Sequence, residues 1–133
     1  YVVASETRIE SIAARARDSK LGFVGINSND PVKYESDSWD NMVKRAERGM
    51  SYPYLHDETQ DIAKSYGAER TPEFYLLDSN KIVIYRGRMD DSPRDPAHVK
   101  SSELSYALDQ ILSGKEISIS RTESIGCSIK WKN

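Results

Sequence analysis

Apolar residues return every three to four positions in four stretches of this chain, which is the spacing of one face of an amphipathic helix. The first stretch runs from near the start of the chain to about residue 18, and the second covers residues 37–49. A third helix is predicted for residues 57–67. A fourth is predicted for residues 104–114, where the apolar stripe is strongest. The pattern therefore predicts four helices that each bury one face.

Short apolar runs lie between these helices and predict strands. Residues 22–26 form such a run and are followed by a cluster of turn-forming residues. Residues 74–77 and 82–85 are joined by a polar turn, which predicts an antiparallel hairpin. From residue 115 onward the periodicity weakens, so residues 115–133 are predicted to form an extended C-terminal tail. Because no linker, repeat or low-complexity segment divides the chain, residues 1–133 are predicted to form a single domain.

Two of the predicted helix starts carry residues that commonly cap helices. Asp37 stands before the second helix, with Asp40 in its first turn, and is the predicted N-cap. Asp57 and Gln60 are three residues apart and form a capping-box pattern at the third helix. Both helices are therefore predicted to begin at an acidic residue.

A proline stands directly before the run at 74–77. Because proline has no N–H to donate to a sheet, Pro72 belongs at the beginning of that strand. The bond between Thr71 and Pro72 can be cis or trans on the sequence alone, since the cis form of an X-Pro bond costs only about 0.5–1 kcal/mol. A proline at this point leaves nearby backbone groups free to pair outside the sheet. We therefore predict a substrate-binding groove formed by Arg70, Thr71, Pro72 and Glu73.

Composition narrows the range of partners. The 133 residues include 19 basic and 21 acidic side chains, a net charge of −2, so nucleic acid and anionic membrane are not expected partners. No apolar run approaches the roughly 20 residues of a membrane span, and the first residues lack the pattern of a signal peptide. A soluble, cytoplasmic protein is therefore expected.

Cys127 is the only cysteine, which excludes an intramolecular disulfide, a dithiol pair or a thiolate-built zinc site within these residues. The segment 56–58 coincides with a predicted helix start. Asp90, Asp91 and Asp95 lack the ordered spacing and the glycine of a calcium loop. No metal site and no cofactor are therefore predicted.

The order of elements, with a proline opening the hairpin and a helix following it, resembles the thioredoxin fold. It is most similar to the redoxin branch, which is related to the peroxiredoxins and the thiol-disulfide oxidoreductases. This resemblance implies an α/β, three-layer fold with a mixed sheet, a redoxin-type helical insertion at 37–49 and a cis bond before Pro72. The matching stretches are residues 23–30, 37–42, 54–60, 70–74, 85–91 and 126–131.

The chain departs from this family pattern at its beginning. Redoxins deliver a reactive cysteine to the start of the first helix on a preceding strand, and helix-terminal amides lower the pKa of such a thiol. The resemblance implies that a Cys-x-x-Cys-Pro segment would stand directly before Tyr1. The same missing strand would lie in the sheet between the strands near 22–26 and 74–77. An upstream segment, a strand from a second copy in a homo-oligomer, or the tail could fill that position, and the upstream segment is favoured.

The resemblance implies a thiol-based redox protein of the antioxidant type, either a thiol-disulfide oxidoreductase or a thiol peroxidase. Its nucleophile would lie before Tyr1, its substrate would be a protein or small-molecule disulfide or a peroxide, and a thiol would donate electrons. Cys127 is the candidate resolving thiol, although an inert anchoring cysteine is the alternative. A different function is a redoxin-fold binding module without catalysis, in which residues 70–73 hold an extended peptide by backbone pairing.

Overall fold

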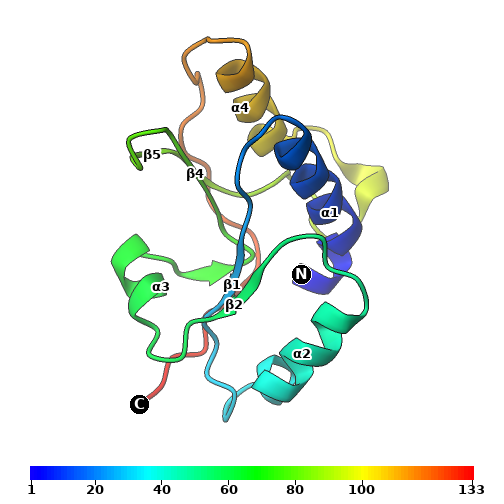
Figure 1. Cartoon of the computed structure of the whole chain (residues 1–133), viewed down its shortest axis with the longest axis vertical. Helices are drawn as coiled ribbons and strands as arrows, with labels where there is room; N and C mark the ends of the chain where they lie inside the picture. Colours follow the sequence, from blue (N-terminus) through cyan, green and yellow to red (C-terminus); the bar gives the residue numbers. More distant parts are fainter. The chain divides into compact units, whose positions relative to one another are not determined.

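A computed structural model describes residues 1–133 of the chain (Figure 1). The chain divides into two compact units, which are described separately below. One unit consists of Tyr1–Thr7 and Arg70–Cys127, and the other consists of Arg8–Glu69 and Ser128–Asn133. The single domain predicted for residues 1–133 stays a prediction. No helix combines the length and the apolar composition needed to cross a membrane.

The unit around Arg8–Glu69 is built on a parallel pair of strands, β1 and β2, with Gly25 opposite Tyr54 and Asn27 opposite His56. The two strands lie side by side in Figure 1. Helix α1 begins in the other unit and continues into this one, and α2 packs against β2. The bounds are α1 (Val2–Asp18), β1 (Gly25–Asn27), the 3-10 helix η1 (Glu35–Asp37), α2 (Trp39–Glu47), β2 (Tyr54–His56) and α3 (Asp61–Tyr66).

The unit around Arg70–Cys127 is built on an antiparallel hairpin, β4 and β5, in which Phe74 lies opposite Gly87 and Leu76 opposite Tyr85. Helix α4 packs against β5. A short strand, β3, pairs with β6, and the first residue of β6 is the last residue of this unit. The bounds are β3 (Arg70–Thr71), β4 (Phe74–Leu77), β5 (Val83–Gly87), the 3-10 helix η2 (Pro96–His98), α4 (Glu103–Leu112) and β6 (Cys127–Ser128).

The mixed α/β class and the order of elements are as the sequence predicts. The strands form three separate two-stranded sheets, one of them parallel and one antiparallel. β1 pairs only with β2, and β4 pairs only with β5. Each of these two strands therefore keeps one edge without a strand neighbour.

The second helix begins one residue later than the sequence predicts. Ser38 is its N-cap, and the Ser38 hydroxyl accepts a hydrogen bond from the Asn41 amide at 3.3 Å. The prediction of Asp37 as the cap was wrong because its carboxylate binds other partners. Arg45 donates to Asp37 at 3.3 Å, and the Asn29 amide group donates to it at 2.8 Å.

The prediction of a capping box at the third helix was wrong, because Asp57 and Gln60 do not cap the helix in that arrangement. Gln60 is the N-cap residue, with a φ of 66°, and its side chain makes no capping hydrogen bond. Asp57 serves the helix start instead, because its carboxylate accepts from the amides of Ile62 at 3.3 Å and Ala63 at 3.0 Å. The helix ends at Gly67 in the left-handed conformation, as glycine at a helix C-terminus commonly does.

The apolar stripes found in the sequence supply the buried residues of the helices. In α4 they are Leu104, Ala107 and Leu108, and the fully buried Tyr85 belongs to the same unit. In α1 the buried apolar residues are Ile9, Ile12, Ala13 and Ala16. Burial of such side chains typically stabilises a fold by about 1.5–3 kcal/mol each for the larger ones.

Candidate functional site

The predicted groove residues lie where β3 ends and β4 begins. The bond between Thr71 and Pro72 is cis, as the family resemblance implies. Arg70 and Thr71 form β3, and Glu73 directly precedes β4. The part of the tail that reaches this point is residues 120–127, which we call the strap.

The strap runs alongside β5 before it reaches β3. Arg86 donates its amide to the Ser120 carbonyl at 3.0 Å, and Thr122 donates its amide to the Arg86 carbonyl at 3.1 Å. Gly87, with a φ of 140°, allows this close approach, because a Cβ atom at that position would lie 2.2 Å from Thr122 Oγ1. In Figure 1 the tail, coloured orange, runs past the hairpin of β4 and β5, and Arg121 of the tail forms a β-bridge with Arg86.

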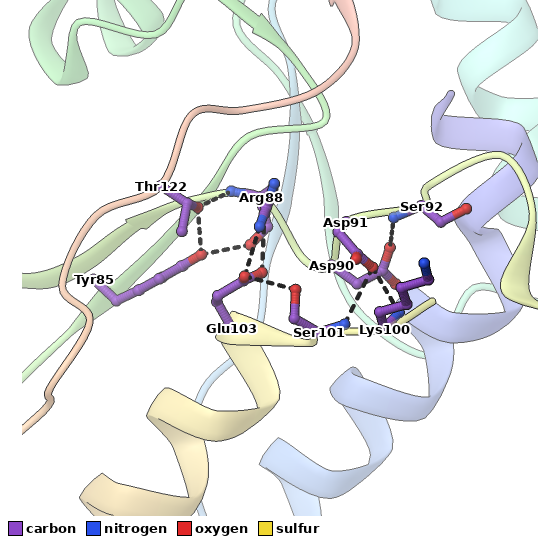
Figure 2. Close-up of polar contacts among 9 residues, drawn as sticks. All are labelled: Tyr85, Arg88, Asp90, Asp91, Ser92, Lys100, Ser101, Glu103 and Thr122. Carbon is purple, nitrogen blue, oxygen red and sulfur yellow. Dashed lines mark hydrogen bonds and ion pairs between the residues drawn. The ribbon is translucent and has the colours of Figure 1, made fainter. Parts of the chain in front are cut away.

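Thr122 fixes the strap to the end of the hairpin (Figure 2). Its hydroxyl accepts from the Arg88 amide at 2.9 Å and lies 2.8 Å from the hydroxyl of Tyr85. Tyr85 in turn donates to the Arg88 carbonyl at 2.6 Å. Burial raises the pKa of Tyr85, so the phenol remains a neutral donor at physiological pH. These three residues form a closed set of hydrogen bonds.

Glu73 is the second anchor of the strap. Its side chain is 6% exposed and accepts from Arg86 at 3.2 Å and from the Ser124 hydroxyl at 3.0 Å. The Tyr75 hydroxyl also donates to this carboxylate. Burial and the adjacent carboxylate both raise the pKa of Tyr75, which therefore stays protonated. The Glu73 carboxylate is thus committed to the fold, and its predicted part in substrate binding stays a prediction.

The strap makes its closest approach at Thr71. A Cβ atom placed on Gly126 would lie 1.9 Å from the Thr71 carbonyl oxygen and 2.6 Å from the carbonyl carbon. No real Cβ atom occupies such a position, so the strap can pass only with glycine there. Cys127 follows directly and is exposed. Arg70 lies 3.9 Å from Glu123 of the strap.

The structure therefore brings all five predicted site residues into one part of a single unit. Arg70, Thr71 and Pro72 lie beside the strap, and Cys127 ends it. The strap itself was not foreseen as part of the site. The one sequence signal for it was the two glycines, because glycine is the residue that permits close backbone approach.

A partly buried ion pair lies next to this region, and the sequence did not predict it. Arg88 donates to the Glu103 carboxylate at 2.9 Å and 2.7 Å, and Ser101 donates to it at 2.9 Å (Figure 2). These contacts, above all the hydrogen bonds from Arg88, lower the pKa of Glu103. Asp91 accepts from the amides of Lys100 and Ser101 at 2.9 Å and 3.2 Å. The group orders the loop between β5 and α4.

The other unit contains a cluster of buried polar side chains from the segments that come directly after β1 and β2 in the sequence. Ser28 donates to Asp57 at 2.7 Å, and Gln60, which is 1% exposed, donates to the carbonyls of Ser28 and Lys130 at 2.7 Å and 2.9 Å. Burial raises the pKa of Asp57, but the hydrogen bonds from Ser28 and from two helix amides outweigh it, so the net pKa is lowered. These groups are paired with one another and with the chain end. The arrangement is therefore that of an internal scaffold.

An open hollow of about 550 Å³ is lined by residues of η1, α2 and the C-cap of α2. Its charges are mixed, and Arg45 is held by Asp37 and by the Tyr54 hydroxyl at 2.8 Å. Across the whole chain, no three His, Cys, Asp or Glu side chains are placed to hold a metal ion. The residues lining the hollow are Ser36, Asn41, Lys44, Arg45, Glu47 and Arg48.

Comparison with known proteins agrees with this description. The Redoxin family model matches residues 2–108. The fold is similar to that of a hypothetical protein from Sinorhizobium meliloti 1021, with 33% identity and a TM-score of 0.88 over 99% of this chain and 73% of that one. An uncharacterized conserved protein from Geobacillus kaustophilus is 41% identical, with a TM-score of 0.90 over 99% of this chain and 71% of that one. A comparison with curated proteins gave no match.

Proposed function

The chain belongs to the Redoxin family, and from this premise we propose that it is the scaffold of a disulfide oxidoreductase or thiol peroxidase of the antioxidant type. Membership of the family points to thiol-based redox function in general. The observation that carries the finer proposal is the convergence of β3, Pro72 and the exposed Cys127 in one unit. In the proposed protein, the edge of β3 faces the substrate.

The chemistry requires a second thiol besides Cys127. In disulfide exchange, a thiolate attacks one sulfur of the substrate disulfide, forms a mixed disulfide and releases the other sulfur as a thiolate. A second thiolate must then attack the mixed disulfide, which releases the reduced substrate and leaves an oxidised disulfide in the protein. An external thiol reduces that disulfide again. We propose that the first nucleophile lies on a segment preceding Tyr1 in the intact protein, as the family pattern implies.

The open edges of β1 and β4 support this proposal. Each strand has a partner on one side only. A strand that carries the nucleophile would offer such an open edge a backbone partner, and backbone groups left unpaired in a protein interior cost about 1–3 kcal/mol each. A preceding segment would therefore supply both the second thiol that the chemistry needs and a backbone partner for an open strand edge.

The test uses the intact protein produced from its natural coding sequence. With dithiothreitol as electron donor, we expect catalytic reduction of insulin disulfides or of hydrogen peroxide, and we expect loss of that activity when the cysteine closest to Tyr1 on its N-terminal side is replaced by serine. The predicted resolving role of Cys127 is tested by Cys127→Ser. An unchanged rate of turnover in that variant would identify Cys127 as a structural residue.

Absence of turnover with both substrates would contradict the proposal. The alternative function, a redoxin-fold module that binds peptides without catalysis, would then describe the protein better. A matched control is Ser128→Ala, which alters an exposed neighbour of Cys127 without removing a thiol.

A further inference from the structure

The backbone edge of β3 is already occupied by the chain itself. β3 pairs with β6, and the strap lies so close to β3 that a Cβ atom on Gly126 would stand 1.9 Å from the Thr71 carbonyl oxygen. An extended peptide that binds by strand addition uses the same kind of backbone N–H and C=O groups. Two segments cannot pair with one edge at the same time.

We propose that residues 123–127 of the strap are an internal competitor for the peptide-binding edge of β3. This inference rests on the substrate-facing edge of β3 in the proposed function, and it adds what controls access to that edge. An extended partner binds only when this part of the strap lifts away from Thr71.

The contacts of the strap show which part can lift. Residues 120–122 are firmly held, by two backbone hydrogen bonds to Arg86 and by the Thr122 hydroxyl. Glu123 and Ser124 are held by side-chain contacts, whereas Cys127 belongs to β6, which pairs with β3. The pair between Arg70 and Glu123 is 3.9 Å long, with 42% of the arginine side chain and 90% of the glutamate side chain exposed, and exposed pairs of this kind contribute little. The shorter contact in this part is the 3.0 Å hydrogen bond from the Ser124 hydroxyl to the Glu73 carboxylate.

The fit of the strap also indicates which partners the edge accepts. The residue facing the Thr71 carbonyl cannot carry a Cβ atom, so it must be glycine. A hydroxyl two residues earlier reaches the buried Glu73 carboxylate, and an acidic side chain one residue before that faces Arg70. The expected partner is therefore an extended peptide segment with the order acid, hydroxyl residue, any residue, glycine.

The test measures binding of a fluorescent synthetic peptide that copies residues 120–127 with Cys127→Ser. The proteins are the wild type, Gly126→Ala and Gly22→Ala, each as the intact chain. Gly126→Ala forces its own strap off the Thr71 carbonyl. Gly22→Ala is the matched control, because its new Cβ meets no atom within 4 Å and its backbone is not left-handed. Fluorescence anisotropy gives the dissociation constants.

We expect Gly126→Ala to bind the peptide about tenfold or more tightly than the wild type, the equivalent of about 1.4 kcal/mol. Gly22→Ala should bind as weakly as the wild type, and a peptide that carries Gly126→Ala should bind neither variant. The proposal is overturned if Gly126→Ala keeps the circular dichroism spectrum and melting temperature of the wild type but binds no more tightly. Equal, tight binding by the wild type would also overturn it.

If Gly126→Ala does not fold, Ser124→Ala replaces it, because this change removes the anchor to Glu73 without adding an atom. We then expect about threefold or greater tightening, which is well within the effect of losing one hydrogen bond to a charged group. No tightening would count against the proposal. The peptide contains no thiol, so this result does not depend on redox activity. A failure here and a failure of the redox assay are therefore distinguishable.

Discussion

The guanidinium group of Arg88 forms two hydrogen bonds with the carboxylate of Glu103, at 2.9 Å from Nε and at 2.7 Å from Nη2. Glu103 is 9% exposed and opens α4, whereas Arg88 directly follows β5. A paired fork of this kind fixes both distance and orientation. It therefore holds the start of α4 to the end of the hairpin that carries the strap (Figure 2).

Replacing this carboxylate should destabilise the fold. We expect Glu103→Ala to lower the free energy of unfolding by about 2 kcal/mol, because the hydrogen bonds from Arg88 and Ser101 lose a charged acceptor. Urea denaturation followed by circular dichroism measures the change. Glu116→Ala, at an exposed position in the tail, is the control and should change stability by less than about 0.5 kcal/mol. Equal losses in the two variants would show that the pair contributes nothing.

The same pair predicts a pH dependence with a definite sign. Hydrogen bonds from Arg88 lower the pKa of Glu103 in the folded chain. Its stabilising contribution is therefore complete above the ordinary glutamate pKa of about 4.3 and is lost as the pH falls through the lowered value of the folded state. The difference in unfolding free energy between wild type and Glu103→Gln should be constant from pH 7 to about 5 and shrink below pH 4. A difference that grows on acidification would contradict the assignment.

The sequence predicted the helices well because their signal is local. The stripe of α4 repeats within a single helix, and Leu104, Ala107 and Leu108 of that stripe are buried in the structure. Helix ends were less predictable. Asp37 and Ser38 are both good capping residues, and the choice between them depends on Arg45, which binds Asp37 from eight residues away. No local rule contains that information.

The site was predicted in part, for the same reason. Residues 70–73 were found because proline marks the start of a strand whatever lies around it. Arg86 binds Glu73, and Arg88 binds Glu103. These partners, and the strap itself, are brought together by chain folding over intervals of thirteen to fifty-one residues. Residue patterns within a window cannot show them.

Gly87 should be among the least replaceable residues of the hairpin. Its φ of 140° disfavours any side chain, and a Cβ atom would also lie 2.5 Å from the Thr122 carbonyl oxygen. We expect Gly87→Ala to lower the free energy of unfolding by about 2 kcal/mol or more. Hydrogen exchange should also become faster at the Thr122 amide, which bonds to Arg86 in the wild type. Gly22→Ala is the control, and an equally small effect in both variants would show that the strap does not lie against β5.

Gln60 should determine how firmly the end of the chain is held in the other unit. Its side chain donates to the carbonyls of Ser28 and Lys130 and accepts from the Lys132 amide at 2.9 Å. Gln60→Leu keeps the approximate size but leaves these backbone groups without their partner. Unpaired buried groups cost about 1–3 kcal/mol, so we expect a loss of about 2 kcal/mol in the free energy of unfolding.

Hydrogen exchange separates this local role from general destabilisation. In Gln60→Leu the Lys132 amide should exchange at least about tenfold faster, because its acceptor is gone. The exchange rates of the α4 amides should change only as far as the global stability changes. Gln110→Leu is the matched control, since Gln110 is a partly exposed glutamine that bonds to Ser118 within the other unit. Unchanged protection of Lys132 in Gln60→Leu would mean that the chain end is held by its other contacts, among them the hydrogen bond from the Lys130 amide to Asn29 at 2.8 Å.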